Sequence, residues 1–225
     1  GTPCQVAGLR RYIGKDDPML LTVDCACHGV PGPGLWEMYL KSLKERYGVI
    51  GHIAFRDKGR GWCHYDFNVN GKVVPYMNDP YMALFAQNMT LRPSCYRCPV
   101  RNGRSGSDMT LADLWNVAET VQEMNDDRGV SLVCVNSDKG RDAFESVRNC
   151  LDAKPVKYEC AIRNNGGFAE HVLMPERRAE FFTGIHSAKD LHAYMTGFVV
   201  RKSLPVRAYK TARRLLVKLK RKILK

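Results

Sequence analysis

The sequence predicts an α/β fold, with α+β as the alternative, in which helices flank a mixed β-sheet. Short apolar segments of strand length alternate with segments whose apolar residues recur at helical spacing. The chain has 225 residues, 44% of them hydrophobic and 26% charged, so it can bury a sizeable core without disulfide bonds. We expect one body over residues 1–200 and a basic amphipathic tail helix over residues 201–225.

The separate elements follow from periodicity and from residues that typically begin or end them. Asn70-Gly71 predicts a tight hairpin, Asp79 followed by Pro80 predicts a helix start, and Ser137 predicts another. We expect helices at residues 6–13, 35–47, 79–88, 137–149, 176–182 and 188–194. We expect strands at residues 19–24, 50–55, 62–69, 72–76, 109–114, 132–135 and 156–162.

The net charge of +12 is concentrated in the tail. Residues 201–225 hold eleven of the 35 Lys and Arg residues and no acid, so residues 1–200 are nearly neutral. A basic tail on a neutral body argues against nucleic acid as the partner. After Pro205 the apolar residues form one narrow stripe, which favours a helix that rests on its own body or docks on an acidic protein or an anionic membrane surface.

The cysteines point to a reducing compartment. There are nine of them, an odd number, and no export signal is visible. Reduced thiols or metal ligands therefore fit better than a disulfide framework. We expect a cytoplasmic protein; if the tail docks on an anionic membrane surface, that surface is the inner face of the membrane.

Four cysteines lie in segments rich in Pro and Gly. Cys95 and Cys98 form a C-x-x-C pair bracketed by prolines, which favours a rigid ligand loop over a redox dithiol. Cys4 follows Gly-Thr-Pro, and Cys27 precedes a run of Gly and Pro. Four thiolates from three loops suit zinc or an iron–sulfur cluster, and this spacing favours the cluster, although a fold without metal stays open.

The remaining cysteines are assigned other roles. Cys25 could replace Cys27 as a ligand, and His28 is better suited to a turn, or to supporting the ligands from behind, than to ligation. Cys134 lies in an apolar strand and is expected to be buried. Cys150 and Cys160 are expected to be structural, and Cys63 is ambiguous.

Ordered motifs in the first 182 residues resemble a known family. The sequence is similar to the C-terminal domain of the beta subunit of deazaflavin-coenzyme (coenzyme F-420) hydrogenases and dehydrogenases. The motifs are GTPCQ at residue 1, CHGVP at residue 27, FRDK at residue 55 with GW at residue 61, RPSCYRC at residue 92 and SDMTLADLW at residue 107.

The resemblance implies an iron–sulfur flavoprotein oxidoreductase. Electrons would pass between a [4Fe–4S] cluster and FAD, and then to a deazaflavin or another acceptor. Cys4, Cys27, Cys95 and Cys98 match the motif cysteines and become the expected cluster ligands. The resemblance also implies a ferredoxin-like domain or a redox partner protein, and a further portion of chain before residue 1.

FAD needs cations or amides for its pyrophosphate and a flat slot for its ring. Arg56 and Lys58 are candidates for the phosphates, and Trp62 or Tyr96 for a wall of the ring site. Each has a structural alternative, because an Arg-Asp-Lys turn is commonly solvated and a Trp is commonly in the core. Asp108 and Asp113, in a segment that contains a Trp, complete the candidate set. A structural role is the alternative for both.

Other chemistries lack support in the sequence. No G-x-G-x-x-G loop and no G-x-S-x-G motif is present, so neither a Rossmann phosphate loop nor a hydrolase site is indicated, and no catalytic residue is assigned. The alternative function is a non-catalytic interaction module of a larger redox or polysaccharide-associated protein. Ala112 and Asn116 stand where the family usually has Gly, and Leu114 where it has Phe, which motivates that alternative together with the basic tail.

Overall fold

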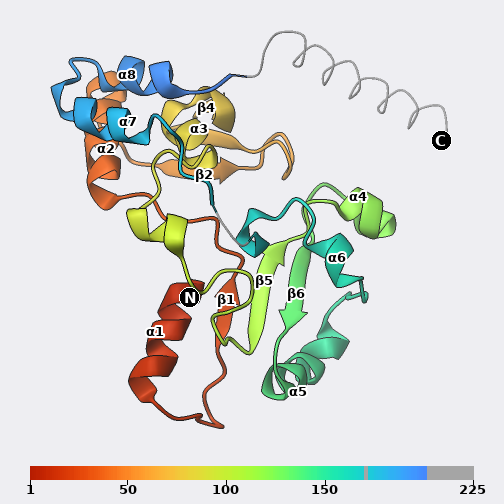
Figure 1. Ribbon diagram of the computed structural model, residues 1–225. Helices are drawn as coiled ribbons and strands as arrows, with labels where there is room; N and C mark the ends of the chain where they lie inside the picture. Colours follow the sequence, from red (N-terminus) through yellow and green to blue (C-terminus); the bar gives the residue numbers. More distant parts are fainter. Residues whose placement is uncertain (170–171, 202–225) are drawn as a thin grey trace, which may run out of the picture.

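The computed structural model describes residues 1–169 and 172–201, and it confirms a mixed sheet flanked by helices (Figure 1). In the lower region of Figure 1, β1 (Val23–Cys25) pairs in parallel with β5 (Met109–Asp113), which pairs antiparallel with β6 (Ser131–Val135). Helix α1 (Pro3–Ile13) lies beside β1, and α5 (Asp138–Val147) lies beside β6. The predicted basic tail helix falls outside the described residues.

The upper region is built on a second, antiparallel sheet. Its strands β2 (Ile53–Asp57), β3 (Asp66–Val69) and β4 (Lys72–Pro75) follow one another in order. Around them lie the helices α2 (Pro33–Tyr47), α3 (Pro80–Ala86), α7 (Arg178–Gly184) and α8 (Leu191–Phe198). The core of this region is the larger one, and its fully buried members include Tyr39, Phe67, Leu84, Phe181 and Met195.

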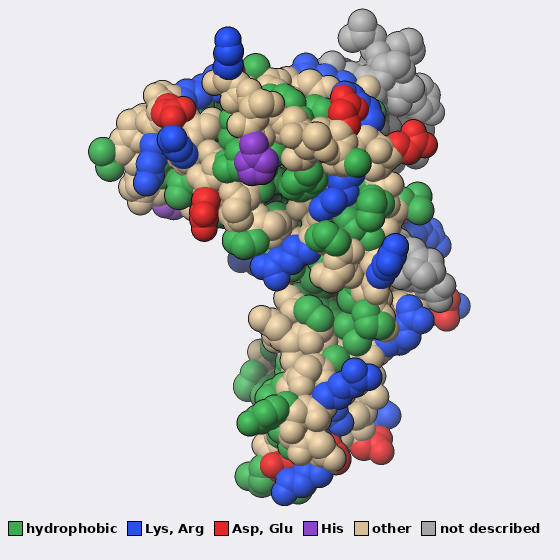
Figure 2. Space-filling view, turned by 60° about the vertical axis from the view of Figure 1, so that its left-hand side comes forward, with side chains coloured by type: hydrophobic (Ala, Val, Ile, Leu, Met, Phe, Trp, Pro, Cys, Tyr) green, Lys and Arg blue, Asp and Glu red, His purple; other side chains and the backbone are tan. Residues whose placement is uncertain are grey.

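A separate core supports the sheet of the lower region. It contains Trp62 and Leu132 and is packed against α4 (Val117–Thr120) and α6 (Tyr158–Ala161). The space-filling view shows the result, a broad upper region above a narrower lower one (Figure 2). Across residues 1–169 and 172–201, no helix has the length and apolar character that a membrane crossing requires.

Local signals in the sequence are confirmed where the chain reverses or a helix begins. Asn70 and Gly71 both have positive φ, 51° and 82°, as a tight hairpin between β3 and β4 requires. The Asp79 carboxylate accepts a hydrogen bond from the Met82 amide at 3.0 Å and caps α3. Ser137 caps α5 by accepting from the Gly140 amide at 3.0 Å.

Some predicted elements are shorter or of another kind. Of the strand expected at 19–24, only the end is present, where β1 begins at Val23. The strand expected at 62–69 begins at Asp66. The strand expected at 156–162 is wrong, because this segment contains the helix α6, whose Ala161 is buried in the lower core. A short apolar run cannot by periodicity alone distinguish a strand from one helical turn.

Candidate functional site

One cavity collects all four cysteines that the sequence singles out as ligands. Cys4 lies in the first turn of α1, not in the expected loop, and Cys27 lies two residues after β1. Cys95 lies in the 3-10 helix Pro93–Arg97, and Cys98 ends it. The cavity, called the cysteine pocket below, is lined by Pro3, Cys4, Cys27, Gly29, Val30, Cys95, Cys98, Arg101 and Gly167.

The start of α1 is fixed against the sheet, and this places Cys4. The Gly1 amino group donates to the Val23 carbonyl on β1 at 2.9 Å. Thr2 and Gln5 form a capping box that begins the helix. The Thr2 hydroxyl lies 3.2 Å from the Cys4 sulfur, and the Cys4 side chain is exposed.

The loops that carry Cys27 and Cys95 are joined by backbone hydrogen bonds. Pro31 and Leu91 form an isolated β-bridge, and the Arg92 amide donates to the Val30 carbonyl at 2.8 Å. The Val30 amide donates to the Cys95 sulfur at 3.4 Å. An amide aimed at a cysteine sulfur is the type of contact that tunes cysteine-ligated metal centres.

Two glycines let the segments approach closely enough to form the pocket. Gly29 has a φ of 141°, and a Cβ there would lie 2.8 Å from Leu91. A Cβ on Gly167 would lie 2.4 Å from the backbone carbon of Ala26. Any larger residue at either position would push the Cys27 loop away from its neighbours.

Arg101 is a member of the pocket that the sequence analysis missed. Its side chain is buried, with 4% of the residue exposed. The guanidinium donates to the carbonyls of His28 at 3.0 Å and Ala169 at 3.2 Å, and also to that of Gly166. In the sequence it stands in a polar, Gly-containing stretch that is typical of a solvated loop, so only its position three residues after Cys98 could have marked it.

Burial and nearby positive groups have opposite effects on the pKa of Cys27. Burial raises the pKa of the Cys27 thiol, while the Gly29 amide and the Arg101 charge act to lower it. In residues 1–169 and 172–201, no three His, Cys, Asp or Glu side chains are grouped closely enough to hold a single metal ion. The four thiols therefore surround a common cavity without converging to the distances of a one-ion site.

The other cysteines and His28 lie outside the lining of this pocket. Cys25 is the last residue of β1 and is exposed, so Cys27 and not Cys25 faces the cavity. The His28 ring lies 3.2 Å from the Phe85 carbonyl and packs edge-on against the Phe85 ring, which agrees with a role in the turn. Cys134 is half-buried on β6 and packs against the lower core.

Three of the flavin candidates lie together, away from the pocket lining. Arg56 pairs with Asp113 at 2.9 Å, and its guanidinium lies over the rings of Tyr65 and Trp115. Trp62 stacks on Trp115 with a centroid distance of 4.9 Å. Trp62 is only 1% exposed, so its ring is part of the core and Trp115, half-buried, forms the accessible face of this group.

Lys58 and Tyr96, two further candidates for flavin contacts, have other surroundings. Lys58 is exposed in a turn in which the Asp57 carboxylate accepts from the Gly59 amide, as in an ordinary solvated turn. Tyr96 is buried, and its hydroxyl donates to the Asn88 carbonyl and accepts from Arg178 at 3.1 Å. Its ring therefore supports the Cys95–Cys98 loop from within.

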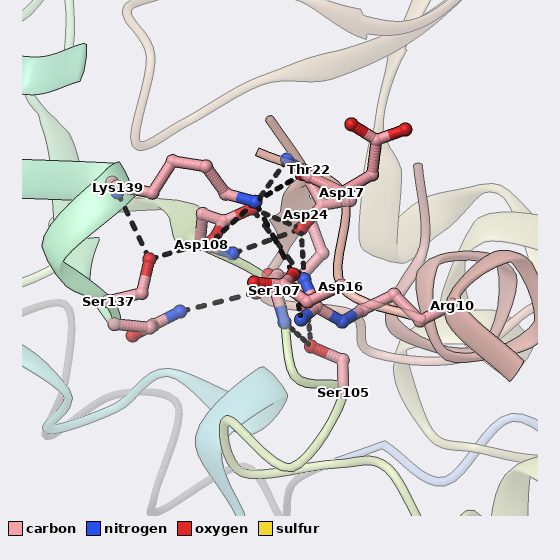
Figure 3. Close-up of polar contacts among 12 residues, drawn as sticks. Arg10, Asp16, Asp17, Thr22, Asp24, Ser105, Ser107, Asp108, Ser137 and Lys139 are labelled. Atoms are coloured by element: carbon pink, nitrogen blue, oxygen red, sulfur yellow. Dashed lines mark hydrogen bonds and ion pairs between the residues drawn. The ribbon is translucent and has the colours of Figure 1, made fainter. Parts of the chain in front are cut away.

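Asp108 is the centre of a buried polar cluster at the opposite end of α1 and β1 (Figure 3). One carboxylate oxygen accepts from the Thr22 amide at 2.7 Å and from the Thr22 hydroxyl at 2.6 Å, and the other accepts from Ser137 at 2.7 Å. Arg10 and Lys139 lie 3.8 and 3.9 Å away. Burial acts to raise the pKa of Asp108, but these hydrogen bonds and the Lys139 charge outweigh it and lower the pKa below its usual value. The contacts occupy both oxygens, which fits the structural alternative for this residue.

A second hollow on the described surface holds none of the residues predicted as cluster ligands or flavin contacts. It has a volume of about 1020 Å³ and runs along β6, which is at the edge of its sheet. Its lining mixes apolar side chains such as Val133 and Phe144 with charged ones such as Arg128 and Lys154. Its size alone does not connect it with the cysteine chemistry.

Comparison with known proteins places this arrangement in a family. The model that matches describes the C terminus of the beta subunit of coenzyme F420 hydrogenase/dehydrogenase, and it covers residues 1–158, a shorter stretch than the resemblance covers. No curated protein and no solved structure matches the chain. The match covers most of the chain and includes the four pocket cysteines and Arg101, so the chain belongs to the family of C-terminal domains of the coenzyme F420 hydrogenase/dehydrogenase beta subunit.

Proposed function

We propose that this chain is an electron-transfer module in which Cys4, Cys27, Cys95 and Cys98 hold a [4Fe–4S] cluster close to a bound FAD. The cluster supplies one-electron transfer, and the flavin supplies hydride transfer to a deazaflavin or another acceptor. The observation that carries the proposal is the single cavity lined by these four thiols, which come from three segments far apart in the sequence.

The donor set favours a cluster over a zinc ion. Zinc draws four sulfurs to about 2.3 Å from one point. In a cubane cluster each cysteine binds its own iron, so the four sulfurs stand further apart around a larger centre. Four thiols around one cavity, with no group tight enough for a single ion among the described residues, suit the second arrangement better.

The residues of the chain have distinct tasks in this proposal. The Val30 amide donates to the Cys95 sulfur, and the Gly29 amide acts on Cys27, so both would stabilise thiolate charge. The 3-10 helix holds Cys95 and Cys98 in fixed positions, and Tyr96 anchors that helix to the core. Cys4 is the exposed ligand, so a ferredoxin-like domain or other redox partner would approach on its side.

The flavin part of the proposal rests on the group around Trp115. Arg56 is an exposed cation held in place by Asp113 and by two aromatic rings. A fixed guanidinium suits a phosphate, and the Trp115 face suits a planar ring. We therefore assign Arg56 to the FAD pyrophosphate and Asp113 to its orientation, with Trp62 supporting Trp115 from the core.

The test is anaerobic reconstitution with iron and sulfide, followed by metal analysis and visible absorption. Wild-type protein should become brown and hold iron and sulfide in equal amounts. C27A and C95A should lose most of the iron, whereas C25A, two residues from Cys27 and outside the pocket, should retain it. Wild-type protein that binds zinc in preference, or no metal, would refute the cluster.

A second candidate function is favoured by two residues at positions where the family usually has others. Leu114 is buried in the lower core, and Asn116 donates to the Cys160 carbonyl at 2.7 Å, so both are used in packing. This fits an interaction module without flavin. Under it, the double variant C4A/C95A would bind its partner as wild type does, and deletion of residues 205–225 would abolish that binding.

A further inference from the structure

The cysteine pocket contains a fixed positive charge whose contacts are all with neutral groups among the described residues. Arg101 lines the cavity together with the four thiols. Its observed partners are the carbonyls of His28, Gly166 and Ala169, each reached by a different nitrogen of the guanidinium. Carbonyl oxygens satisfy N–H donors, but they do not neutralise a charge.

This charge cannot be removed by loss of a proton. A buried Lys or carboxyl can become neutral, but Arg stays protonated in proteins. A buried cation without an anion nearby is costly, so it marks a place where negative charge is expected. Among the described residues that line the pocket, only the thiols can supply that charge, and thiols ionise when they bind metal.

The carbonyl contacts also fix the position of the guanidinium. Arg has five N–H donors in a rigid plane, so three bonds to three carbonyls leave donors directed elsewhere. The contacts come from the loop after Cys27 and from the segment at 166–169, which encloses the pocket with Gly167. The plane of Arg101 is therefore held by the same segments that form the cavity.

We propose that Arg101 is the counter-cation of the cysteine pocket and that its charge stabilises the reduced state of the cluster held there. This inference rests on the proposed function. A cluster held by four thiolates is anionic, and one added electron makes it more so. A fixed cation beside it favours the reduced form and raises the reduction potential.

The experiment compares two changes at Arg101 with a matched change nearby. R101Q keeps amide donors for the carbonyls but removes the charge, and R101K keeps the charge but loses most of the donors. R104Q removes the same charge from an exposed side chain three residues away. Glu170 follows Ala169 in the sequence, so E170Q tests whether that acid is the counter-ion instead.

The measurement is the midpoint potential of the reconstituted cluster at constant pH, with iron content and circular dichroism of each chain. We expect the equilibrium constant for reduction of the cluster to be about tenfold lower in R101Q than in wild type. For a one-electron couple this lowers the midpoint potential by about 59 mV. R101K, R104Q and E170Q should stay close to wild type. An R101Q potential equal to that of wild type would overturn the inference.

A variant that loses the cluster is still informative. If folded R101Q holds no iron, R101K should hold it, because the charge is retained. If folded R101K loses the iron as well, the hydrogen bonds and not the charge matter, and the inference is wrong. Wild-type protein without iron would instead refute the proposed function, so the two failures are distinguishable.

Discussion

The cysteine pocket and the Asp108 cluster share three parts of the chain, namely α1, the region of β1, and residues 93–108. The pocket adds Gly167, and the cluster adds Ser137 and Lys139. In the Asp108 cluster, both carboxylate oxygens are occupied by donors from Thr22 and Ser137. In the cysteine pocket, four thiols and a guanidinium face a cavity. The side chains of the Asp108 cluster satisfy one another, whereas the pocket groups face an open cavity, and the proposed function assigns a cluster to it.

The largest effect on the fold is expected at Asp108. D108A removes a buried acceptor and leaves the Thr22 amide and the Ser137 hydroxyl without their partner. We expect the free energy of unfolding to fall by about 3 kcal/mol, measured by urea denaturation. D16A is the control, since Asp16 pairs with the same cations but its side chain is 74% exposed. Equal losses in the two variants would contradict the description of Asp108 as the centre of the cluster.

A smaller loss is expected at Gly167, on the pocket side. The Cβ of G167A would lie 2.4 Å from the Ala26 backbone carbon, so the loop before Cys27 must move. We expect a loss of about 2 kcal/mol together with reduced iron uptake. In G8A, in an open and exposed position on α1, the same change should stabilise the protein by about 0.5 kcal/mol. G167A with wild-type stability and iron uptake would show that close packing does not form the pocket.

The stability of the Asp108 cluster should depend on pH in one direction. The pKa of Asp108 is lower in the folded protein than in the unfolded chain, where a carboxyl of this type titrates near pH 3.9. Its contribution is therefore complete above that value and is lost as the pH falls through the lower folded pKa. The difference between wild type and D108N in urea midpoint should shrink below about pH 4. A stability difference that grows as the pH falls would mean that folding raises, and does not lower, the pKa of Asp108.

The smallest effect is expected for an exposed ion pair. Arg177, which precedes α7, and Glu180 in its first turn lie 2.7 Å apart, and both side chains are more than half exposed. Water and salt screen such a pair, so E180Q should leave the urea midpoint unchanged. A clear fall of the urea midpoint in E180Q would mean that exposure does not distinguish the charges that stabilise this fold from those that do not.

The sequence was sufficient for features that depend on local chemistry. Asn70-Gly71 forms the hairpin, and Asp79 and Ser137 cap their helices, because each signal acts within a few residues. That the four cysteines line one cavity was predictable, because they stand in or beside Pro- and Gly-rich segments and because the motif order resembles a family. The division into two sheets was not predictable, since strand patterns do not reveal which strands pair.

Features that depend on distant segments were missed or misread. Arg101 is buried because residues 166–169 cover it, and no pattern near residue 101 signals that contact. Trp62 and Asp108 stand in motifs whose pattern does not reveal burial. Only the structure shows that the Trp62 ring is stacked in the core and that the Asp108 carboxylate is buried. The segment 156–162 was misread because an apolar run of this length suits a strand or a helical turn equally.

The most direct test of the central claim is electron paramagnetic resonance of the anaerobically reconstituted protein after reduction with dithionite. We predict the signal of a reduced [4Fe–4S] cluster in wild type and in C25A, and its loss in C4A, C27A, C95A and C98A. A wild-type spectrum without a cluster signal, or a signal that survives removal of the four pocket cysteines, would contradict the account.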